Sequence, residues 1–450
     1  MNELTQPQQE QVERLLERAL DVPAEARAAM LESACDDPAV RTEVESLLAA
    51  RPAADRLLNA PLADGAAFAE ALRDLSEHAD TGSDAFEDPK QIGPYRILSR
   101  LGEGGMGTVY LAEQTEPLRR RVAIKLIKPG MDTRSVLRRF DAERQALALM
   151  NHPNVARALD AGATPEGRPY FVMELVDGSR ITEFCDARRL DTTARLSLFL
   201  DVCRAIQHAH QKGVIHRDIK PSNVLVSQAN GTPVAKVIDF GVAKATHQRL
   251  TEQTLFTETG VMIGTPEYMS PEQADQRAAD IDTRSDIYSL GVLLYELLVG
   301  ALPLGGDSFR TVGLNEVQRI IREQEPVRPS TRLSSLGGAA DTAARDRSAS
   351  TSSLRRQLRG DLDWVVMKCL EKDRDRRYAT TAELAEDIKR SMRYEPVTAG
   401  PPSRRYRARK FVRRNRALVV GVSAVFVVLV AGVFSTAIFA AGESRQRVAA

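Results

Sequence analysis

The sequence predicts an α+β protein of two lobes, a β-rich lobe followed by a helical lobe, with a helical stretch before them and an apolar stretch after them. Three observations predict this arrangement. Residues 95–127 alternate apolar and polar positions around a cluster of glycines, as strands joined by a tight turn do. From about residue 193 onward, apolar positions recur at helical spacing. Residues 417–441 contain no charged side chain.

The composition is that of a globular protein without a charge bias. The 450 residues are 43% hydrophobic and 27% charged, which is enough chain for two or three domains with ordinary cores. Because 62 Lys and Arg face 61 Asp and Glu, there is no overall electrostatic case for a nucleic-acid partner. Four cysteines without a C-x-x-C pair argue against a zinc site or a disulfide framework.

Residues 1–75 predict a small helical module, because Val12, Leu15 and Ala19 recur at helical spacing before acidic and proline breaks. No cluster of reactive side chains occurs in this stretch, so we expect a folding or docking appendage. Residues 76–93 are acidic and poor in aromatic side chains, and they predict a flexible linker. The first residues lack the basic start and apolar run of a secretory signal, so we expect the part before residue 417 to remain cytoplasmic.

The 25 uncharged residues 417–441 predict a transmembrane helix, since about 20 suffice to cross a bilayer. The alternative is a buried helix of a soluble protein, apolar on every side. Residues 396–416 form a basic juxtamembrane segment, with eight Lys and Arg between 404 and 416. The excess of positive charge on this side predicts that it is cytoplasmic and that residues 442–450 form an extracytoplasmic stub. The basic residues either bind anionic headgroups or only set the topology.

Residues 334–353 are rich in Ser, Ala and Gly and poor in large apolar side chains. This composition predicts a mobile, low-complexity insertion within the helical lobe.

Residues 101–109, LGEGGMGTV, predict a glycine-rich turn. Glycines at 102, 104 and 107 would let backbone amides approach phosphate groups closely. A dinucleotide-binding turn has the same spacing but opens a helix, whereas this sequence continues as a strand through Val109 and Tyr110. The context indicates a hairpin over a nucleotide, and an ordinary hairpin turn remains the alternative.

Lys125 lies among apolar strand residues in VAIK, where a buried ammonium group needs a nearby anion. Glu143 lies in a helix-forming run, on the face shared with Phe140 and Leu147. We expect Lys125 and Glu143 to form an ion pair that holds the amine against nucleotide phosphates. The alternative for Glu143 is a solvated helix carboxylate.

The stretch GVIHRDIKPSNVLV, residues 213–226, places charged and polar side chains between two apolar anchors. With KVIDFG at 236–241 and GTPEYMSPEQ at 264–273, these motifs stand in the order of one family. Residues from about 95 to 393 resemble the bacterial eukaryotic-like (Hanks-type) Ser/Thr protein kinases. The resemblance implies a protein kinase fold over residues 94–395, with the N-lobe at 94–176 and the C-lobe at 177–395.

By this resemblance, Asp218 is the catalytic base that accepts the proton of a substrate hydroxyl. Lys220 neutralises charge on the transferring phosphoryl group, and Lys125 with Glu143 positions the nucleotide. Asn223 and Asp239 hold the metal ion, Mg²⁺ or in its place Mn²⁺. ATP is the expected cosubstrate.

The resemblance also implies the nucleotide site. His216 is expected to be a structural core residue. Met173 is expected at the back of the adenine pocket and Leu225 at its floor, and backbone groups of Glu174 and Val176 are expected to pair with adenine. The expected ATP-binding residues are Leu101, Gly102, Glu103, Gly104, Gly105, Met106, Gly107, Thr108, Val109, Ala123, Lys125, Met173, Glu174, Val176 and Leu225.

Three further positions are expected to support the site. Glu272 would pair with Arg377, and Asp286 would brace the catalytic loop from a buried helix. Thr265 would lie beside Asp218. Ser270 stands where the family's Ala-Pro-Glu signature has alanine, and both residues are small.

The implied function is an ATP-dependent Ser/Thr protein kinase of the inner (plasma) membrane, with protein substrates, autophosphorylation and a role in transmembrane signalling. Thr257 or Thr259 is the expected loop phosphorylation site. A homodimer is plausible, because small residues such as Gly421 and Ala424 in the span would let helices approach. The alternatives are a membrane-tethered pseudokinase or scaffold, and a receptor whose sensor lies beyond the membrane.

Overall fold

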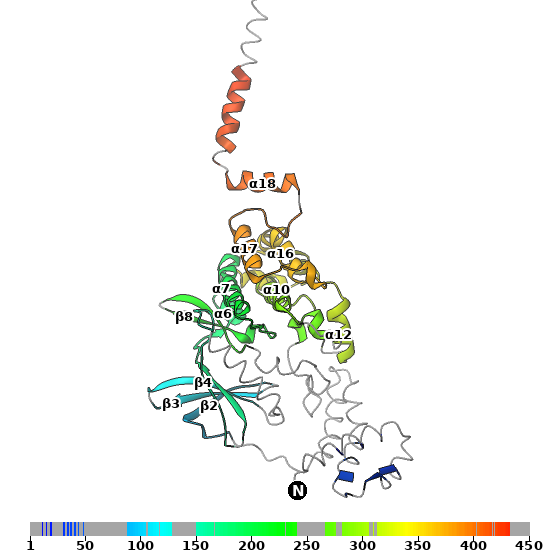
Figure 1. Cartoon of the computed structure of the whole chain (residues 1–450). Helices are drawn as coiled ribbons and strands as arrows, with labels where there is room; N and C mark the ends of the chain where they lie inside the picture. Colours follow the sequence, from blue (N-terminus) through cyan, green and yellow to red (C-terminus); the bar gives the residue numbers. More distant parts are fainter. Residues whose placement is uncertain are drawn as a thin grey trace, which may run out of the picture.

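A β-sheet lobe and a helical lobe lie end to end, followed by two C-terminal helices (Figure 1). The computed structural model describes isolated positions between 11 and 48 and then residues 88–104, 107–116, 118–127, 150–165, 167–229, 231–240, 266–275, 281–305, 309, 313–401, 403–415, 417 and 419–432.

The N-lobe is a six-stranded antiparallel sheet in the order β1-β2-β3-β4-β6-β5. Val122, Ile124 and Leu126 of β4 alternate along the strand and are at most 2% exposed, so one face of the sheet forms a core. The strands are β1 (Gln91–Ile92), β2 (Tyr95–Gly104), β3 (Gly107–Gln114), β4 (Arg120–Ile127), β5 (Ala158–Ala163) and β6 (Pro169–Glu174).

The end of the predicted linker belongs to this sheet. Strand β1 pairs with β2, and Ile92 is buried in the N-lobe core. Tyr110 also donates a hydrogen bond to Asp88 Oδ1 (2.9 Å). The lobe therefore begins before residue 94, because one apolar side chain of the linker joins the core.

The C-lobe is built around two long helices, α7 (Thr192–Gln211) and α10 (Thr283–Val299), which both contribute to one large apolar core. Helix α10 begins at the Asp282 cap and ends at Gly300, whose φ of 76° suits glycine. A small sheet of β7 (Ser179–Arg180), β8 (Val224–Ala229) and β9 (Thr232–Val237) lies where the lobe meets the N-lobe (Figure 1). The remaining helices of this part are α6 (Ile181–Ala187), η1 (Pro221–Asn223), η2 (Pro266–Tyr268), α9 (Pro271–Ala274), α12 (Leu314–Glu323), α16 (Asp361–Cys369), η3 (Arg374–Arg376) and α17 (Thr381–Met392).

The segment expected to be a mobile insertion is helical instead. Helices α13 (Pro329–Ser335), α14 (Ala339–Arg345) and α15 (Thr351–Leu358) run through residues 334–353. Alanine is the best helix former, and Ala340, Ala343 and Ala344 share a face that is buried in the C-lobe core. Arg347, 2% exposed, donates to the carbonyls of Leu297 and Ala343 and thereby ties the segment to α10. The small side chains thus pack closely rather than leaving the segment loose.

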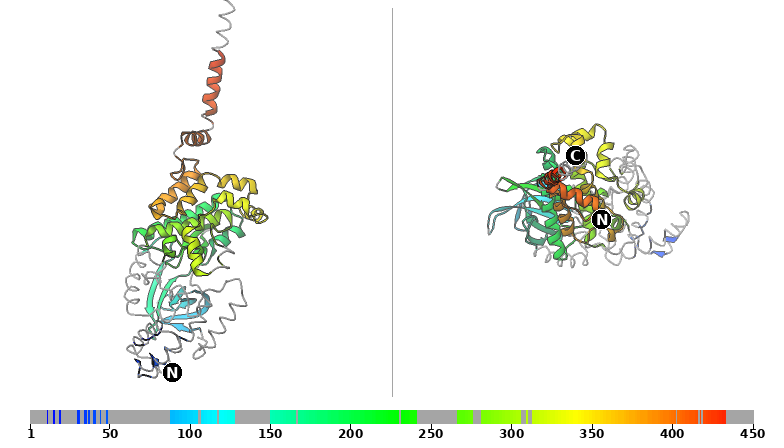
Figure 2. Two further views of the ribbon diagram at one scale, coloured as in Figure 1. Left: turned by 90° about the vertical axis from the view of Figure 1, so that its right-hand side faces the viewer. Right: turned by 90° about the horizontal axis from the view of Figure 1, so that it is seen from above.

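After the C-lobe, α18 (Arg404–Arg414) crosses at a steep angle to the helix that follows it, Val419–Gly432 (Figures 1 and 2). Among the described residues no single helix is both long and apolar enough to cross a membrane. The two helices meet that requirement only as a pair, bent by 97°. The second part of the predicted span, residues 433–441, lies outside the described residues.

The described positions near the N-terminus share a small apolar core of Leu15, Ala19, Leu31, Cys35, Val40 and Val44. The boundaries of the helical module predicted at 1–75 remain a prediction. All four cysteines are buried, and each is a free thiol.

Candidate active site

The catalytic loop is the part of residues 213–226 that carries Asp218. As predicted, the carboxylate of Asp286 holds the backbone of this loop in place. Asp286 is fully buried in the first turn of α10. It accepts hydrogen bonds from the backbone N–H groups of His216 and Arg217 (2.8 Å each) and faces His210 Nε2 at 2.8 Å. Burial alone would raise the pKa of Asp286, but these donors outweigh burial and lower it. A buried carboxylate therefore stays ionised and fixes two consecutive peptide groups.

His216 is a structural residue, in agreement with the prediction. It is fully buried, and its ring lies 4.7 Å from the Phe240 ring. Its Nδ1 accepts the Asp218 N–H at 3.3 Å, and its Nε2 lies 3.2 Å from the Ile238 carbonyl. Burial lowers the pKa of His216, so the neutral ring is the favoured form. The histidine thus links the catalytic loop to the segment that carries Asp239.

Three of the predicted catalytic and metal residues come together on the loop. Lys220 Nζ lies 3.0 Å from Asp218 Oδ2. Asn223 Nδ2 donates to the Asp218 carbonyl (2.8 Å) and to Asp218 Oδ2 (3.1 Å). The Asp218 side chain is 21% exposed, so protein donors orient it while part of it remains accessible.

Asp239 and Lys125 meet across the two lobes. Lys125, 9% exposed in β4, donates to Asp239 Oδ1. Asp239 has a φ of 55°, a left-handed conformation that Asp tolerates better than most residues. The Ile238 N–H donates to the Asn223 carbonyl (2.9 Å), so the backbone keeps the two predicted metal ligands in adjacent segments. Glu143, the predicted partner of Lys125, lies outside the described residues.

The glycine-rich hairpin has open space at some glycines and close contact at another. Gly104 of β2 pairs with Gly107 of β3. A Cβ added at Gly102 or Gly104 would meet no atom within 4 Å, whereas at Gly107 it would lie 2.3 Å from the Leu126 carbonyl. The first two glycines therefore leave room for a ligand, and the third is required by the neighbouring strand. Gly105 and Met106 lie outside the described residues.

The other predicted ATP-binding positions line up on the N-lobe strands, although not all point into a pocket. Ala123 pairs with Met173, and Lys125 with Val109. Thr108 is buried, but Leu101 is 52% exposed. Glu103 is exposed and forms an ion pair with Arg100.

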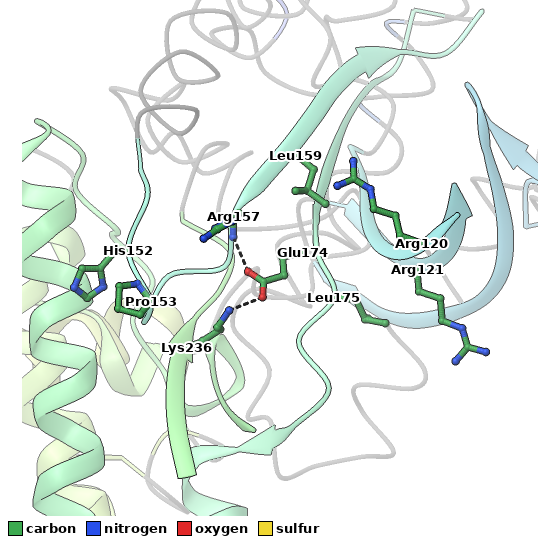
Figure 3. Close-up of a pocket in the computed structure, with 9 residues that line it drawn as sticks. All are labelled: Arg120, Arg121, His152, Pro153, Arg157, Leu159, Glu174, Leu175 and Lys236. Atoms are coloured by element: carbon green, nitrogen blue, oxygen red, sulfur yellow. Dashed lines mark hydrogen bonds and ion pairs between the residues drawn. The ribbon is translucent and has the colours of Figure 1, made fainter. Parts of the chain in front are cut away.

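Residues 174–176 connect the two lobes, and the structure ties Glu174 on both sides. Its carboxylate accepts from the Arg157 N–H (3.3 Å) and from Lys236, and its own N–H donates to the Arg157 carbonyl (2.9 Å) (Figure 3). That N–H is therefore already used and is not a donor for adenine. Val176 is half-buried.

Leu225 lies on the C-lobe side of the predicted adenine site. It is half-buried on β8, between the buried Val224 and Val226. Because side chains alternate along a strand, Leu225 points to the opposite face from these two neighbours. This orientation is the one that a pocket floor needs.

A cavity of about 400 Å³ lies beside this connection, lined in part by Arg120, Arg121, Arg157 and Lys236. Of all its lining residues only Glu174 was predicted to contact the nucleotide, so the cavity is distinct from the expected ATP site. The side chains of Arg120 and Arg121 point in different directions rather than converging on one centre (Figure 3).

The predicted support from Glu272 is confirmed. Arg377 donates two hydrogen bonds to its carboxylate (2.7 and 2.8 Å), and Ser285 donates a third (2.7 Å). Burial would raise the pKa of Glu272, but Arg377 outweighs it and the pKa is lowered. Ser270 caps α9 and is fully buried, so its small size is needed there. Thr265 lies outside the described residues.

Two residues of the site were missed from the sequence. His210 faces Asp286, and Gln273 donates to the Arg217 carbonyl (2.9 Å). The available signal was closeness in sequence: His210 lies shortly before His216, and Gln273 directly follows Glu272. Only the fold, however, brings α7 and α9 against the same loop.

These features define a class of protein, a two-lobed phosphotransferase whose nucleotide would lie between a glycine-rich hairpin and an Asp-Lys-Asn loop. Residues 95–388 match the family model "Protein kinase domain", and the chain therefore belongs to the protein kinase family. The bacterial Ser/Thr kinase resemblance is also confirmed by relatives.

The chain is 37% identical over 310 residues to the serine/threonine-protein kinase PknB of Mycobacterium tuberculosis, covering 68% of this chain and 44% of that protein. It is 35% identical over 294 residues to the serine/threonine-protein kinase Pkn1 of Myxococcus xanthus, covering 65% and 37%. A probable serine/threonine-protein kinase of Streptomyces coelicolor, SCO3848, is 35% identical over 319 residues, covering 70% and 42%. The matched stretch thus spans less than half the length of these relatives.

Proposed function

We propose that this protein is an ATP-dependent Ser/Thr protein kinase that transfers the γ-phosphate to hydroxyl groups of protein substrates. The observation that carries the proposal is the orientation of Asp218 by Lys220 and Asn223, at 3.0 and 3.1 Å. The contact of Lys125 with Asp239 adds a cation from the N-lobe sheet and a carboxylate from the segment next to this loop. The Ser/Thr-kinase relatives support the substrate class.

In the proposed reaction, Asp218 accepts a hydrogen bond from the substrate hydroxyl and takes its proton as the oxygen attacks the terminal phosphorus of ATP, while the bond from that phosphorus to the β–γ bridging oxygen breaks and ADP leaves. Asn223 holds one carboxylate oxygen of Asp218 and so fixes the direction of the other. Lys220 stands next to the position where negative charge grows and stabilises it. Lys125 would exchange its contact with Asp239 for the phosphates.

The side chains of Asn223 and Asp239 fit a divalent cation. Asn223 uses Nδ2 as a donor to Asp218, and its Oδ1, which accepts a hydrogen bond from Ser222 (3.4 Å), is the atom that would bind a metal. Asp239 supplies a carboxylate, and phosphate oxygens and water would complete the oxygen shell that Mg²⁺ requires. Mn²⁺ is compatible with the same donors. When bound, the ion would screen the negative charge of the phosphates.

Phosphotransfer by wild type and Asp218→Asn tests the proposal, with ATP affinity measured separately by calorimetry. We expect the variant to bind ATP normally and to lose about 10²–10⁴-fold in rate. Asp191→Asn, at the cap of α7, is a matched control that should keep full activity because Asn caps equally well. Transfer at equal rates by wild type and Asp218→Asn would refute the assigned role. ATP binding without transfer by wild type would favour the scaffold alternative.

We further propose that residues 417–441 anchor the kinase in the plasma membrane, with the two lobes in the cytoplasm and signals passing across the membrane. The described part supports this proposal because large apolar side chains are exposed on the 419–432 helix, such as Val420 (67%), Phe426 (66%) and Val428 (69%). Flotation of the full chain with lipid vesicles, resistant to alkaline carbonate, is the expected result. Release by carbonate would contradict an integral anchor.

Regulation by autophosphorylation is also a proposal. Thr251, Thr254, Thr257 and Thr259 lie outside the described residues, and Thr257 or Thr259 remains the expected site. Phosphosite mapping of wild type against Asp218→Asn tests this, since loop phosphate should disappear in the variant. A homodimer through Gly421 and Ala424 is tested by crosslinking in vesicles.

A further inference from the structure

Helix α18 is fixed to the C-lobe through Asp361, at the start of α16. Tyr406 donates to Asp361 Oδ1 (2.9 Å), and Lys410 forms an ion pair with Asp361 Oδ2. The Tyr406 ring lies edge-on to Trp364, with ring centroids 5.2 Å apart. The Val397 N–H donates to the Tyr406 hydroxyl (3.1 Å). The basic segment therefore contains a helix that these contacts hold against the C-lobe.

The residues that make these contacts occupy one face of α18. Tyr406 and Lys410 are four residues apart and are less exposed than their neighbours. Arg413 lies with its guanidinium 4.2 Å from the centroid of the Tyr394 ring, beside this face. The charged groups of Lys410 and Arg413 thus contact other side chains of the protein, Asp361 and the Tyr394 ring respectively.

The opposite face of α18 carries exposed apolar side chains among arginines. Phe411 is 49% exposed and Val412 46% exposed. At 100° per residue, Arg404 lies between these two side chains around the helix and Arg405 lies beside Val412, whereas Arg409 lies nearer the inward face; Arg404 and Arg405 are both exposed. A helix face on which exposed apolar side chains alternate with cationic ones is typical of a helix that lies in the plane of a lipid surface.

The direction of α18 agrees with that placement. It is bent by 97° from the helix 419–432, and the two views show it from the side in Figure 1 and nearly end-on in Figure 2, left. If the second helix runs along the bilayer normal, α18 lies parallel to the membrane plane. Beside α18, a cavity of about 550 Å³ is lined by Arg390, Arg407, Arg414 and Glu395; Arg414 pairs with Glu395 (3.4 Å) and Arg390 pairs with Asp387 (3.4 Å).

We propose that the outward face of α18 binds an anionic lipid surface, with Phe411 and Val412 inserted between headgroups and Arg404 and Arg405 facing lipid phosphates. Because the inward face is fixed to Asp361, this contact turns the α16 end of the C-lobe toward the membrane and sets the orientation of the kinase. The inference rests on the proposed membrane anchor and adds a specific lipid partner.

The test uses the full chain in vesicles of phosphatidylcholine, with and without phosphatidylglycerol. Trp364 is the only tryptophan, so Trp364→Phe combined with Phe411→Trp places a single indole on the outward face. Lipids brominated near the headgroup should quench this indole in the anionic vesicles. At about fivefold per arginine, Arg404→Gln with Arg405→Gln should lower the ratio of bound to free helix by about 25-fold.

A matched control is Arg355→Gln with Arg356→Gln, which removes the same charge from exposed positions of α15 and should leave quenching unchanged. Flotation of the same samples separates the two claims. A chain that floats but shows no quenching overturns the lipid contact and leaves the anchor standing. A chain that does not float overturns both. Equal quenching with neutral lipid, or no effect of the arginine changes, overturns the anionic preference.

Discussion

Asp286 accepts the backbone N–H of Arg217 at 2.8 Å, and Arg217 is the residue directly before the proposed base, Asp218. Arg217 has a φ of 63°, an uncommon conformation for a side chain with Cβ, so this carboxylate holds a strained peptide in place. The position of Asp218 therefore depends on a charge on a different element, α10.

Replacing this charge should uncouple the loop from the helix. In Asp286→Asn the amide can accept at one oxygen only, so at least one buried N–H loses its partner. We expect the free energy of unfolding to fall by about 3 kcal/mol and the phosphotransfer rate by about 10²-fold, because small displacements of a catalytic group are costly. Chemical denaturation and single-turnover kinetics measure the two effects. Asp282→Asn on the same helix should change neither by much, and equal losses in both variants would contradict the account.

The Glu272–Arg377 pair should contribute far more stability than an exposed ion pair. The Arg377 side chain is fully buried, whereas Asp375, which pairs with Arg284, is 75% exposed. We expect Arg377→Gln to lower the free energy of unfolding by about 3–5 kcal/mol and Asp375→Asn by less than about 1 kcal/mol. Urea unfolding of both variants decides this, and similar values would show that burial of the pair does not matter.

The two ends of the glycine-rich hairpin should respond differently to alanine. Gly104→Ala meets open space, so stability should change by less than about 1 kcal/mol while the KM for ATP rises. Gly107→Ala must move the Leu126 carbonyl, which lies 2.3 Å from the added Cβ, and should destabilise the N-lobe. Thermal unfolding and ATP titration measure the two effects. Unchanged ATP affinity in Gly104→Ala would show that no phosphate occupies that space.

His216 should make stability depend on pH. Burial lowers its pKa below the ordinary value of 6.5, so under acidic conditions the unfolded chain binds a proton that the folded chain does not. Stability is then complete above 6.5 and is lost as pH falls from 6.5 through the folded pKa. His216→Gln should flatten this loss in urea unfolding on either side of pH 6.5, and an unchanged slope would exclude His216. Burial and the nearby His208 also lower the pKa of His152. The His216→Gln variant should therefore keep part of the pH dependence of stability.

Much of the site followed from the sequence because motif spacing fixes local geometry. Asp218 and Asn223 are five residues apart on one loop, and the Glu272–Arg377 pair followed from the family motif. Two other contacts between distant elements did not follow from any motif. His210 and Asp286 are 76 residues apart, and Lys125 and Asp239 are 114 apart, so only the packed lobes bring them together.

Composition led to one wrong prediction, the mobile insertion, and left the orientation of one helix, α18, undetermined. The Ser- and Ala-rich segment 334–353 folds into helices because small side chains pack closely against α10. From its composition, the basic segment 396–416 gives no indication of which side chains face the protein. In the structure, Lys410 contacts Asp361, whereas Phe411 is 49% exposed. Which face of a short helix meets the protein depends on its partner, and the partner is outside the local sequence.

The most direct test of the central claim is a crystal structure of the kinase with Mg²⁺ and a non-hydrolysable ATP analogue. We predict that the terminal phosphate lies between the side chains of Lys220 and Asp218, with the metal ion bound by Asn223 and Asp239. A terminal phosphate that points away from Asp218, with the metal bound elsewhere, would contradict the account.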